Sequence, residues 1–355
     1  MSIVGQVVAN EQVRSGHQAG VDSGNVNPLY IEQYGGEVEH RILKESFMRQ
    51  FFKFKTIRGT DTLTNDRIGS SALQKVARGI RPVDNGVTFD NISIKIDTIV
   101  LARTNEFVLD SFLSHIDTRK EIGMEHGKEI GKFFDESFLV QGIKACQVTN
   151  LDPDAVSLGG WEGLTPANIV RTAPKGFQGG TPIVLAGVGD ELDPDLLELA
   201  IQDMCQKVEE KDIDIGEAVL LMRPAQYYAL LRNDKLISRD FSSVNGDYAK
   251  GDVLESCGIR IQKTNRFPKV GDVGVTHFLS NAGNGNAYDV TANDQKCVVC
   301  LLMPKALLAG ETIPLTSDVY FDKKEMQWFI DSYLSFAVTP NRAEMAAGIF
   351  SSTVA

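Results

Sequence analysis

Residues 57–87 read IRGTDTLTNDRIGSSALQKVARGIRPVDNGV, a polar, glycine-containing stretch with few apolar side chains. Apolar, strand-like segments flank it at 51–55 and 92–96. A loop this long without secondary structure is uncommon inside a compact domain, and is usually either functional or disordered. The stretch contains no recognisable catalytic motif. We therefore expect a hairpin that rests on another molecule, most simply a second copy of the same chain.

The segment after this stretch is predicted to be a half-buried strand. Over 89–97, Ile92, Ile94 and Ile96 alternate with polar residues, which places the isoleucines on one face. Alternation returns over 316–350, where we expect further long strands. Before the hairpin, 28–50 is predicted to be helical. The first 27 residues have too little apolar content to fold alone, so we expect an arm that orders against a partner.

Residues 110–146 are predicted to form one long helix, because the stretch contains no proline and its apolar residues recur at helical spacing. Gly123, Gly127 and Gly131 recur every four residues and therefore share one helical face. Each glycine weakens a helix interior by ~1 kcal/mol relative to alanine. The glycines therefore predict a helix that must bend, or a face that another backbone crosses closely.

The second half of the chain is predicted to contain a compact α/β domain. After an irregular stretch at 147–190, Asp193 and Pro194 are a typical helix start, an N-cap followed by proline at the first helical position. A short buried strand is predicted at 218–222 and a second helix from Pro224. Further strands are predicted at 258–261 and 297–303.

The composition excludes several classes of function. The chain has 355 residues, 43% hydrophobic and 23% charged, with a formal net charge of −11. This acidic balance argues against a dominant nucleic-acid-binding role, because phosphate affinity comes from clustered lysine and arginine. Residues 40–58 interleave cations with phenylalanines and could bind single-stranded nucleic acid, but we favour an amphipathic strand with one buried aromatic face, or a basic face that meets acidic neighbours. Five scattered cysteines suit a reducing cytosol, and no apolar run reaches the ~20 residues of a membrane span.

No motif with recognisable chemistry is present. The sequence CVVC at 297–300 has the spacing of a zinc half-site, but it lies in an apolar strand where residues three apart point to opposite faces, so we interpret both as core cysteines. No histidine belongs to an H-E-x-x-H motif, and the glycine pattern at 123–128 is one residue short of a P-loop. We therefore predict no catalytic residue, no metal ligand and no cofactor.

The order of these parts resembles the major capsid protein of tailed phages with the Hong Kong 97-type fold, and most closely the capsid proteins of short-tailed phages like T-seven. Each motif alone is weak, and their order and spacing carry the resemblance over about 28–350. The motifs are YGGEV at 34–38, IG at 68–69 before RG at 78–79, DTR at 117–119, GKE at 127–129, RPAQYYALL at 223–231, GIRIQKTNRFP at 258–268, and Tyr333 before RAEMAAG at 342–348.

The resemblance implies an α+β fold with four named parts. It implies an N-terminal arm and helix at 1–50, an E-loop hairpin with flanking strands at 51–97, and a P-domain at 98–190 with a spine helix at 110–146. An A-domain at 191–314 and return strands of the P-domain at 315–355 would complete the subunit.

The resemblance also implies a function and partners. The chain would assemble as hexamers and pentamers into an icosahedral shell in the host cytoplasm. That shell would enclose double-stranded DNA without sequence-specific binding. The implied partners are other copies of the chain, a scaffolding protein, a portal at one vertex and possible cement or decoration proteins. The hairpin cations would pair with acids on an adjacent subunit; they are Arg67, Lys75, Arg78 and Arg81.

Two alternatives stay open at this point. An encapsulin-like nanocompartment shell would have the same fold, and shell diameter would distinguish it from a phage head. A soluble α/β enzyme with unfamiliar motif spacing would instead be monomeric and would contain a pocket that binds a ligand.

Overall fold

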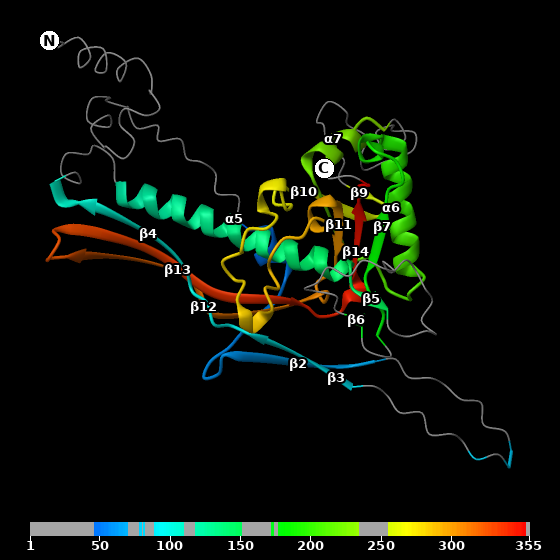
Figure 1. The fold of residues 1–355 in the computed structure, drawn as a ribbon, viewed down its shortest axis with the longest axis horizontal. Helices are drawn as coiled ribbons and strands as arrows, with labels where there is room; N and C mark the ends of the chain where they lie inside the picture. The colour runs from blue at the N-terminus through cyan, green and yellow to red at the C-terminus, as the bar shows by residue number, and fades with distance from the viewer. Residues whose placement is uncertain are drawn as a thin grey trace, which may run out of the picture. The chain divides into compact units, whose positions relative to one another are not determined.

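A computed structural model gives the fold of the chain, and it describes residues 46–69, 78–79, 81, 89–109, 118–150, 172–173, 177–233 and 255–352 (Figure 1). The chain divides into two compact units. The smaller is formed by 1–45, 99–131 and 313–334, and the larger by the remaining residues. The expected arm at 1–27, most of the helix expected over 28–50 and the start of the long helix at 110–117 lie outside the described residues.

The larger unit contains a mixed six-stranded sheet in the order β7-β14-β11-β8-β10-β9. All six residues of β11 are buried, and this strand pairs antiparallel with both β14 and β8. The strands are β7 Thr181–Val184, β8 Val219–Met222, β9 Glu255–Ser256, β10 Ile259–Lys263, β11 Cys297–Leu302 and β14 Ala346–Phe350.

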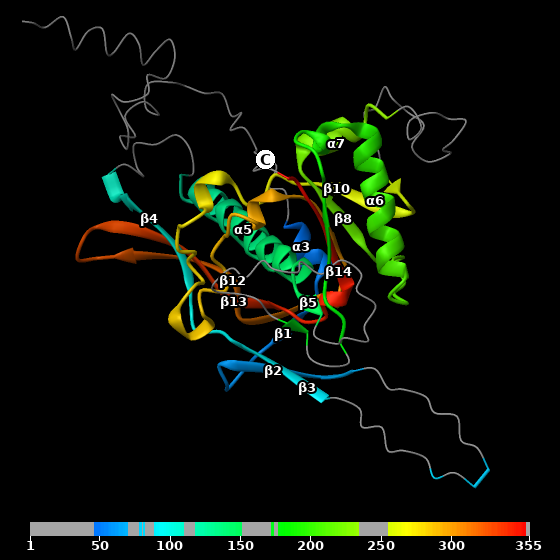
Figure 2. The same cartoon turned by 45° about the vertical axis from the view of Figure 1, so that its right-hand side comes forward.

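Two helices cover one face of this sheet, namely α6 (Pro194–Glu209) and α7 (Pro224–Leu230) (Figure 2). The predicted helix start is confirmed, because the Asp193 carboxylate accepts hydrogen bonds from the backbone N–H groups of Asp195 and Leu196. The apolar face of α6 packs into the core formed with the sheet; its buried members are Leu197, Ala200, Ile201, Met204, Cys205 and Val208.

The opposite face of the sheet contacts the C-terminal part of the long helix α5 (Thr118–Cys146). A Cβ atom added at Gly142 would lie 2.9 Å from Leu302 of β11, and the Cys146 Sγ lies 3.8 Å from the Cys300 Sγ. The predicted core cysteines, Cys297 and Cys300, are confirmed as buried. The register of β11 against β14 shifts between Cys297 and Val299, so the strand does not alternate regularly over the whole CVVC stretch.

The segment before the hairpin differs from the continuous strand expected over 51–55. A short helix α3 (Phe47–Phe51), capped by Ser46, is followed by the strand β1 (Phe54–Thr56). The expected aromatic face is confirmed, because the Phe52 ring is buried 5.5 Å from the Phe138 ring of α5. Aromatic packing on α5 therefore determines the conformation here, overriding the local strand propensity.

The two long strands near the C-terminus, β12 (Leu307–Asp322) and β13 (Gln327–Pro340), confirm the predicted return to strand structure. They belong to a four-stranded sheet in the order β1-β12-β13-β4. In the smaller unit, β4 (Val100–Phe107) pairs antiparallel with 327–334 of β13.

Sheet membership differs from the segment boundaries expected from the sequence. The strand β7 lies within 147–190, which we expected to be irregular, and β14 lies within 315–355, assigned to a different domain. Both join the six-stranded sheet, where β14 pairs with β11 and β7. The stretch 147–190 also contributes a short parallel pair, β5 (Thr149–Asn150) with β6 (Thr172–Ala173). Pairings between strands this far apart leave no local signal in the sequence.

Candidate intersubunit surface

The expected hairpin is present as an antiparallel pair of strands, β2 (Thr62–Ile68) and β3 (Phe89–Lys95) (Figure 1). Their register runs from the pair Thr62–Lys95 to the pair Ile68–Phe89. Side chains on both strands alternate between exposed and partly or fully buried. The hairpin therefore has an inner face, which packs on other parts of the larger unit, and an outer face, whose side chains are exposed.

The inner face begins with a small apolar cluster, and the predicted burial of Ile92, Ile94 and Ile96 is confirmed there. Ile94 and Ile96 are buried against Leu308 of β12 and Ala337 of β13. A glycine permits this close approach, because a Cβ atom at Gly310 would lie 3.1 Å from the Ile96 side chain. The base of the hairpin is thus packed on the long strands.

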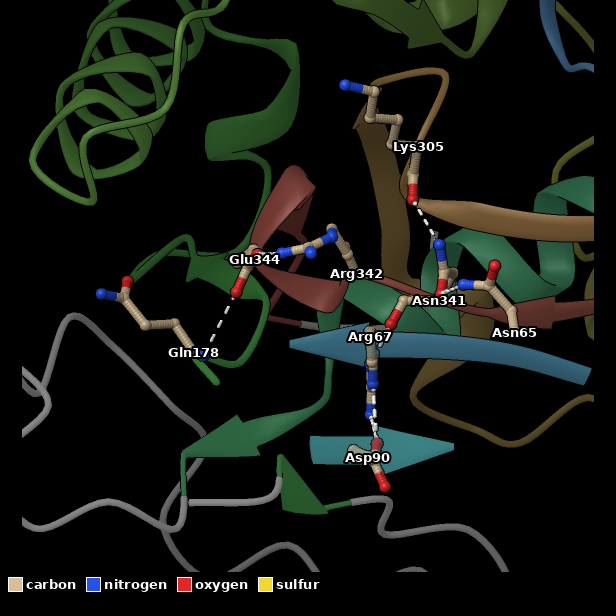
Figure 3. A network of polar contacts seen from close by, with 8 residues as sticks. All are labelled: Asn65, Arg67, Asp90, Gln178, Lys305, Asn341, Arg342 and Glu344. Carbon is tan, nitrogen blue, oxygen red and sulfur yellow. Dashed lines mark hydrogen bonds and ion pairs between the residues drawn. The ribbon is translucent and has the colours of Figure 1, made fainter. Parts of the chain in front are cut away.

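Further along the inner face, apolar packing is replaced by a polar network around Arg67 (Figure 3). The Arg67 guanidinium donates from Nε to the Asp90 carboxylate at 2.7 Å, from Nη2 to the same carboxylate, and from Nη1 to the backbone carbonyl of Asn341. It also lies 4.6 Å from the centroid of the Phe177 ring. Charge-assisted bonds of this kind are about twice as strong as neutral ones.

Asn341, which directly follows β13, connects the hairpin to the adjacent turns. Its side chain accepts a hydrogen bond from Asn65 at 3.1 Å and donates to the backbone carbonyl of Lys305 at 3.3 Å. Its backbone N–H donates to the carbonyl of Ala306 at 2.8 Å. Arg67 and Asn65 therefore bind a residue that is itself held in place by two further hydrogen bonds, of which Figure 3 shows the one to Lys305.

The outer face ends in an exposed apolar pair. Ile68 is 57% exposed and its cross-strand partner Phe89 is 73% exposed. Both point away from the Arg67 network, because they occupy the alternate positions on their strands. Sequence analysis did not single out this pair, although extending the alternation of 92–96 back to position 89 would have placed Phe89 on the polar face.

The four predicted contact cations occupy different environments. The Arg67 side chain is 12% exposed and bonded within its own chain, whereas Arg78 and Arg81 are exposed. Lys75 lies outside the described residues. The structure therefore gives Arg67 a role in holding the hairpin, and leaves Arg78 and Arg81 accessible to a neighbour.

The predicted glycine face of the long helix is open where its surroundings are described. A Cβ atom added at Gly127 or Gly131 would meet no atom within 4 Å. Nothing is described around Gly123. Close packing against the described residues therefore does not account for Gly127 and Gly131. Bending of the helix, or contact with a second subunit, stays as a prediction.

A second exposed surface lies on β4 and β13 of the smaller unit. The Arg103 guanidinium makes a two-bond contact with the Asp331 carboxylate, at 2.7 and 2.6 Å, and this contact raises the pKa of Arg103. Beside this ion pair, Leu101 and Phe107 are 50% and 56% exposed on the same face of β4. On the other face, the Thr104 hydroxyl lies 2.7 Å from His126 Nε2 of α5.

The part of the chain that the structure describes has no centre that suggests metal or membrane chemistry. Among those residues, no group of three or more histidine, cysteine, aspartate or glutamate side chains could hold a metal ion. Nor is any helix within the described ranges long and apolar enough to cross a membrane.

Comparison with known proteins gives one family and a set of similar structures. The family model of Gp10A-like major capsid proteins matches residues 94–307. No protein with a curated description matches the chain in sequence.

Three solved capsid structures illustrate the similarity in fold. The mature capsid of bacteriophage PhiM1 is 23% identical with a TM-score of 0.70, and the alignment covers 96% of this chain and 98% of that one. The cyanophage P-SCSP1u capsid is 19% identical with a TM-score of 0.72, at 96% and 98% coverage. The Ralstonia phage GP4 capsid is 13% identical with a TM-score of 0.56, at 94% and 97% coverage. These matches confirm the α+β capsid fold expected from the sequence.

Proposed function

The chain belongs to the Gp10A-like family of major capsid proteins, and from this premise we propose that its copies close an icosahedral shell by placing the β2–β3 hairpin of each subunit on a neighbour. As a major capsid protein, it is a structural component of the phage virion, where many copies build the capsid. The family is not one of enzymes, and the comparisons support neither the encapsulin-like nor the enzyme alternative.

The resemblance extends this proposal to the assembly as a whole. The subunits would form hexamers and pentamers of a short-tailed phage head, with a scaffolding protein during assembly, a portal at one vertex, and double-stranded DNA inside. In Hong Kong 97-type terms, residues 51–97 would be the E-loop and 191–314 the main part of the A-domain. Because β7 and β14 complete the A-domain sheet, we extend that domain to include them.

The exposed pair Ile68–Phe89 is the main observation that supports contact between the hairpin and a neighbouring subunit. The inner face of the hairpin is occupied by its own chain, so its outer face is the one available to a partner. An exposed cross-strand aliphatic–aromatic pair gains apolar burial when a neighbour covers it, at roughly 25 cal/mol per Å². One such contact is weak, but repetition around a closed lattice makes it decisive.

The contact is tested with the double variant Ile68→Thr and Phe89→Thr, produced with a scaffolding protein and imaged by negative-stain electron microscopy. We expect folded subunits by circular dichroism but few or no closed shells. The matched control replaces Thr64 and Ser93, the exposed cross-strand pair four residues nearer the base, with alanine; it should leave assembly unchanged. Normal yields of closed shells from the threonine variant would refute the hairpin contact.

The exposed cations are tested separately. Replacing Lys75, Arg78 and Arg81 with glutamate should block assembly if these residues pair with acids on the adjacent subunit. The control is Lys95→Glu, which reverses an exposed charge at the base of the same hairpin. Equal assembly of both variants at low and at high salt would rule out the charge pairing, because exposed ion pairs weaken with ionic strength.

A further inference from the structure

A pocket lies between the C-terminal half of α5 and the loop that follows β10. Its volume is about 300 Å³, at the lower end of the range for pockets that hold small molecules. Much of its wall is apolar, and the side chains of that kind include Phe133, Val140, Phe267, Val275, Phe278 and Val290. Phe278 and Val275 are also 78% and 59% exposed. The pocket therefore presents an apolar surface that the described part of the chain leaves uncovered.

The walls of the pocket are held in place by contacts within the larger unit. The Phe133 ring stacks on the His277 ring at a centroid distance of 4.9 Å, and it lies 5.7 Å from the Phe278 ring. On the loop, the Arg223 guanidinium donates to the backbone carbonyl of Pro268 at 3.0 Å. A side chain that enters the pocket therefore meets a preformed surface, so little binding energy is lost in ordering it.

Charged residues also line the pocket, two cations and two acids. The cations are Arg266 and Lys269, and Lys269 is exposed. Of the acids, Glu136 belongs to α5, and the Asp272 carboxylate accepts a hydrogen bond from the backbone N–H of Lys269 at 2.7 Å. The loop side of the pocket therefore offers two cations to an acid on a partner.

The outer face of the β2–β3 hairpin has the complementary pattern. Ile68 and Phe89 pair across the strands and are 57% and 73% exposed. The next exposed cross-strand pair on the same face is Asp66 with Asn91, joined by a hydrogen bond of 2.5 Å. The hairpin thus presents two apolar side chains beside an acid, and the pocket presents an apolar wall beside two cations.

We propose, on the basis of the hairpin contact between subunits, that this pocket is the surface of the neighbour that receives Ile68 and Phe89. The two side chains enter between α5 and the loop, and Asp66 lies against Arg266 and Lys269. Aromatic side chains seated in pockets are typical anchors of protein interfaces. The apolar pair supplies most of the affinity, while the charges mainly fix the orientation of the hairpin.

The partner in this contact is a second copy, because the hairpin does not fill the pocket of its own chain. Its inner face is packed on the long strands and bonded to Asn341, and Phe89 stays largely exposed. The hairpin and the pocket are different surfaces of the subunit, so the contact is heterologous. Contacts of this kind close into rings when the rotation between copies allows it, which agrees with the hexamers and pentamers proposed above.

A charge reversal tests the orientation. Asp66→Lys should lower the yield of closed shells at low salt, and Lys269→Asp in the same chain should restore it. The control is Asp61→Lys, which reverses an exposed acid at the base of the hairpin and should not respond to Lys269→Asp. Failure of Lys269→Asp to restore assembly, or equal restoration of both variants, would overturn the pairing of Asp66 with the pocket.

Photo-crosslinking tests which segment occupies the pocket. The variant Phe278→Bpa, where Bpa is p-benzoylphenylalanine, is co-assembled as a minority with isotope-labelled parent subunits, so shells form even if the variant alone assembles poorly. After irradiation and digestion, we expect position 278 joined to labelled peptides from 62–68 or 89–95. The control is Val188→Bpa, because Val188 is also 78% exposed but does not line the pocket.

The outcomes separate the pocket from the hairpin contact itself. Crosslinks from position 278 to 1–45 or to another part of a neighbour, or no more crosslinking than in the control, would overturn the pocket as the receiving surface. The variant Phe89→Bpa in the same co-assembly then reports where the hairpin lies. If position 89 joins labelled peptides outside the pocket, the hairpin contact stands and only the pocket is wrong. If it joins no labelled peptide, both are wrong.

Discussion

The six-stranded sheet and the β2–β3 hairpin are held in place in different ways. The central strand β11 is buried along its whole length, between α6 and α7 on one face and the end of α5 on the other. No residue of β2 is fully buried, and in β3 only Ile94 is. The sheet therefore obtains its stability within one chain. The hairpin combines a small apolar base with the Arg67 network and leaves its outer face uncovered, as expected of a segment completed by assembly.

The largest expected effect is in the sheet. Leu301 of β11 is completely buried in the main core, and Leu301→Ala should lower the free energy of unfolding of the unassembled subunit by about 4 kcal/mol, because it leaves a cavity. Ile94→Ala in the hairpin should cost about half as much, since the base cluster can relax. Urea denaturation of both variants checks the difference. A larger loss for Ile94→Ala would reverse the comparison between the two regions.

The second-largest effect is a loss of stability at acidic pH, which should not affect the hairpin. The His277 ring stacks on Phe133 of α5 and on Tyr288, with centroids 4.9 and 5.5 Å away, and its Nδ1 accepts the backbone N–H of Leu279. Burial first, and Lys144 second, lower the pKa of His277 to about 4, against the attraction of Asp289 and Asp272.

The sign of this pH dependence follows from the lowered pKa. Between about pH 6.5 and pH 4 the unfolded chain binds a proton that the folded chain does not, so stability falls as the pH falls through that window. The free energy of unfolding should drop by about 2.5 kcal/mol from pH 7.5 to pH 4.5. His277→Asn should remove most of this drop, while the protection of the 62–68 amides against hydrogen exchange, relative to an unfolded chain at the same pH, changes little in the parent. Equal pH dependence in the variant and the parent would exclude His277 as the cause.

A smaller effect is expected at the Arg67 network, which holds the hairpin on the rest of the chain. Arg67→Ala and Asp90→Ala should show a coupling energy of about 1.5 kcal/mol in a double-mutant cycle, because the pair is largely shielded from solvent. The observable is faster hydrogen exchange of the β2 and β3 amides. Arg67→Lys should restore little, since an ammonium cannot bind the Asp90 carboxylate and the Asn341 carbonyl in the same fork.

The exposed pair Lys95–Asp61 provides the control for this cycle. Its side chains are 58% and 60% exposed, so its coupling energy should be near zero. A coupling of Arg67 with Asp90 no larger than this control would mean that the hairpin is held by its apolar base alone.

The contrast between the regions also explains what the sequence could predict. Periodicity located the strand containing Ile92 and Ile94, the long helix, and the helix that begins at Asp193, because each pattern lies within one short segment. The register shift at Cys297 and the addition of β7 and β14 to the central sheet depend on distant pairings, so local patterns could not reveal them. Arg67 was recognised as a hairpin cation, but its partner Asn341 is remote in sequence, so its inward role could not be foreseen.

The smallest effect concerns the helix α5. It distinguishes a glycine that faces open space from a glycine that is required by close packing. A Cβ atom at Gly127 meets open space, so Gly127→Ala should stabilise the unassembled subunit by about 1 kcal/mol. A Cβ atom at Gly142 would lie 2.9 Å from Leu302, so Gly142→Ala should not give that gain. If Gly127 lets the helix bend between shell states, its alanine variant will yield more stable subunits but shells that fail to mature, as judged by particle diameter. Normal maturation of these shells would exclude a role for Gly127 in bending. The hypothesis to test would then be that Gly127 contacts a second subunit.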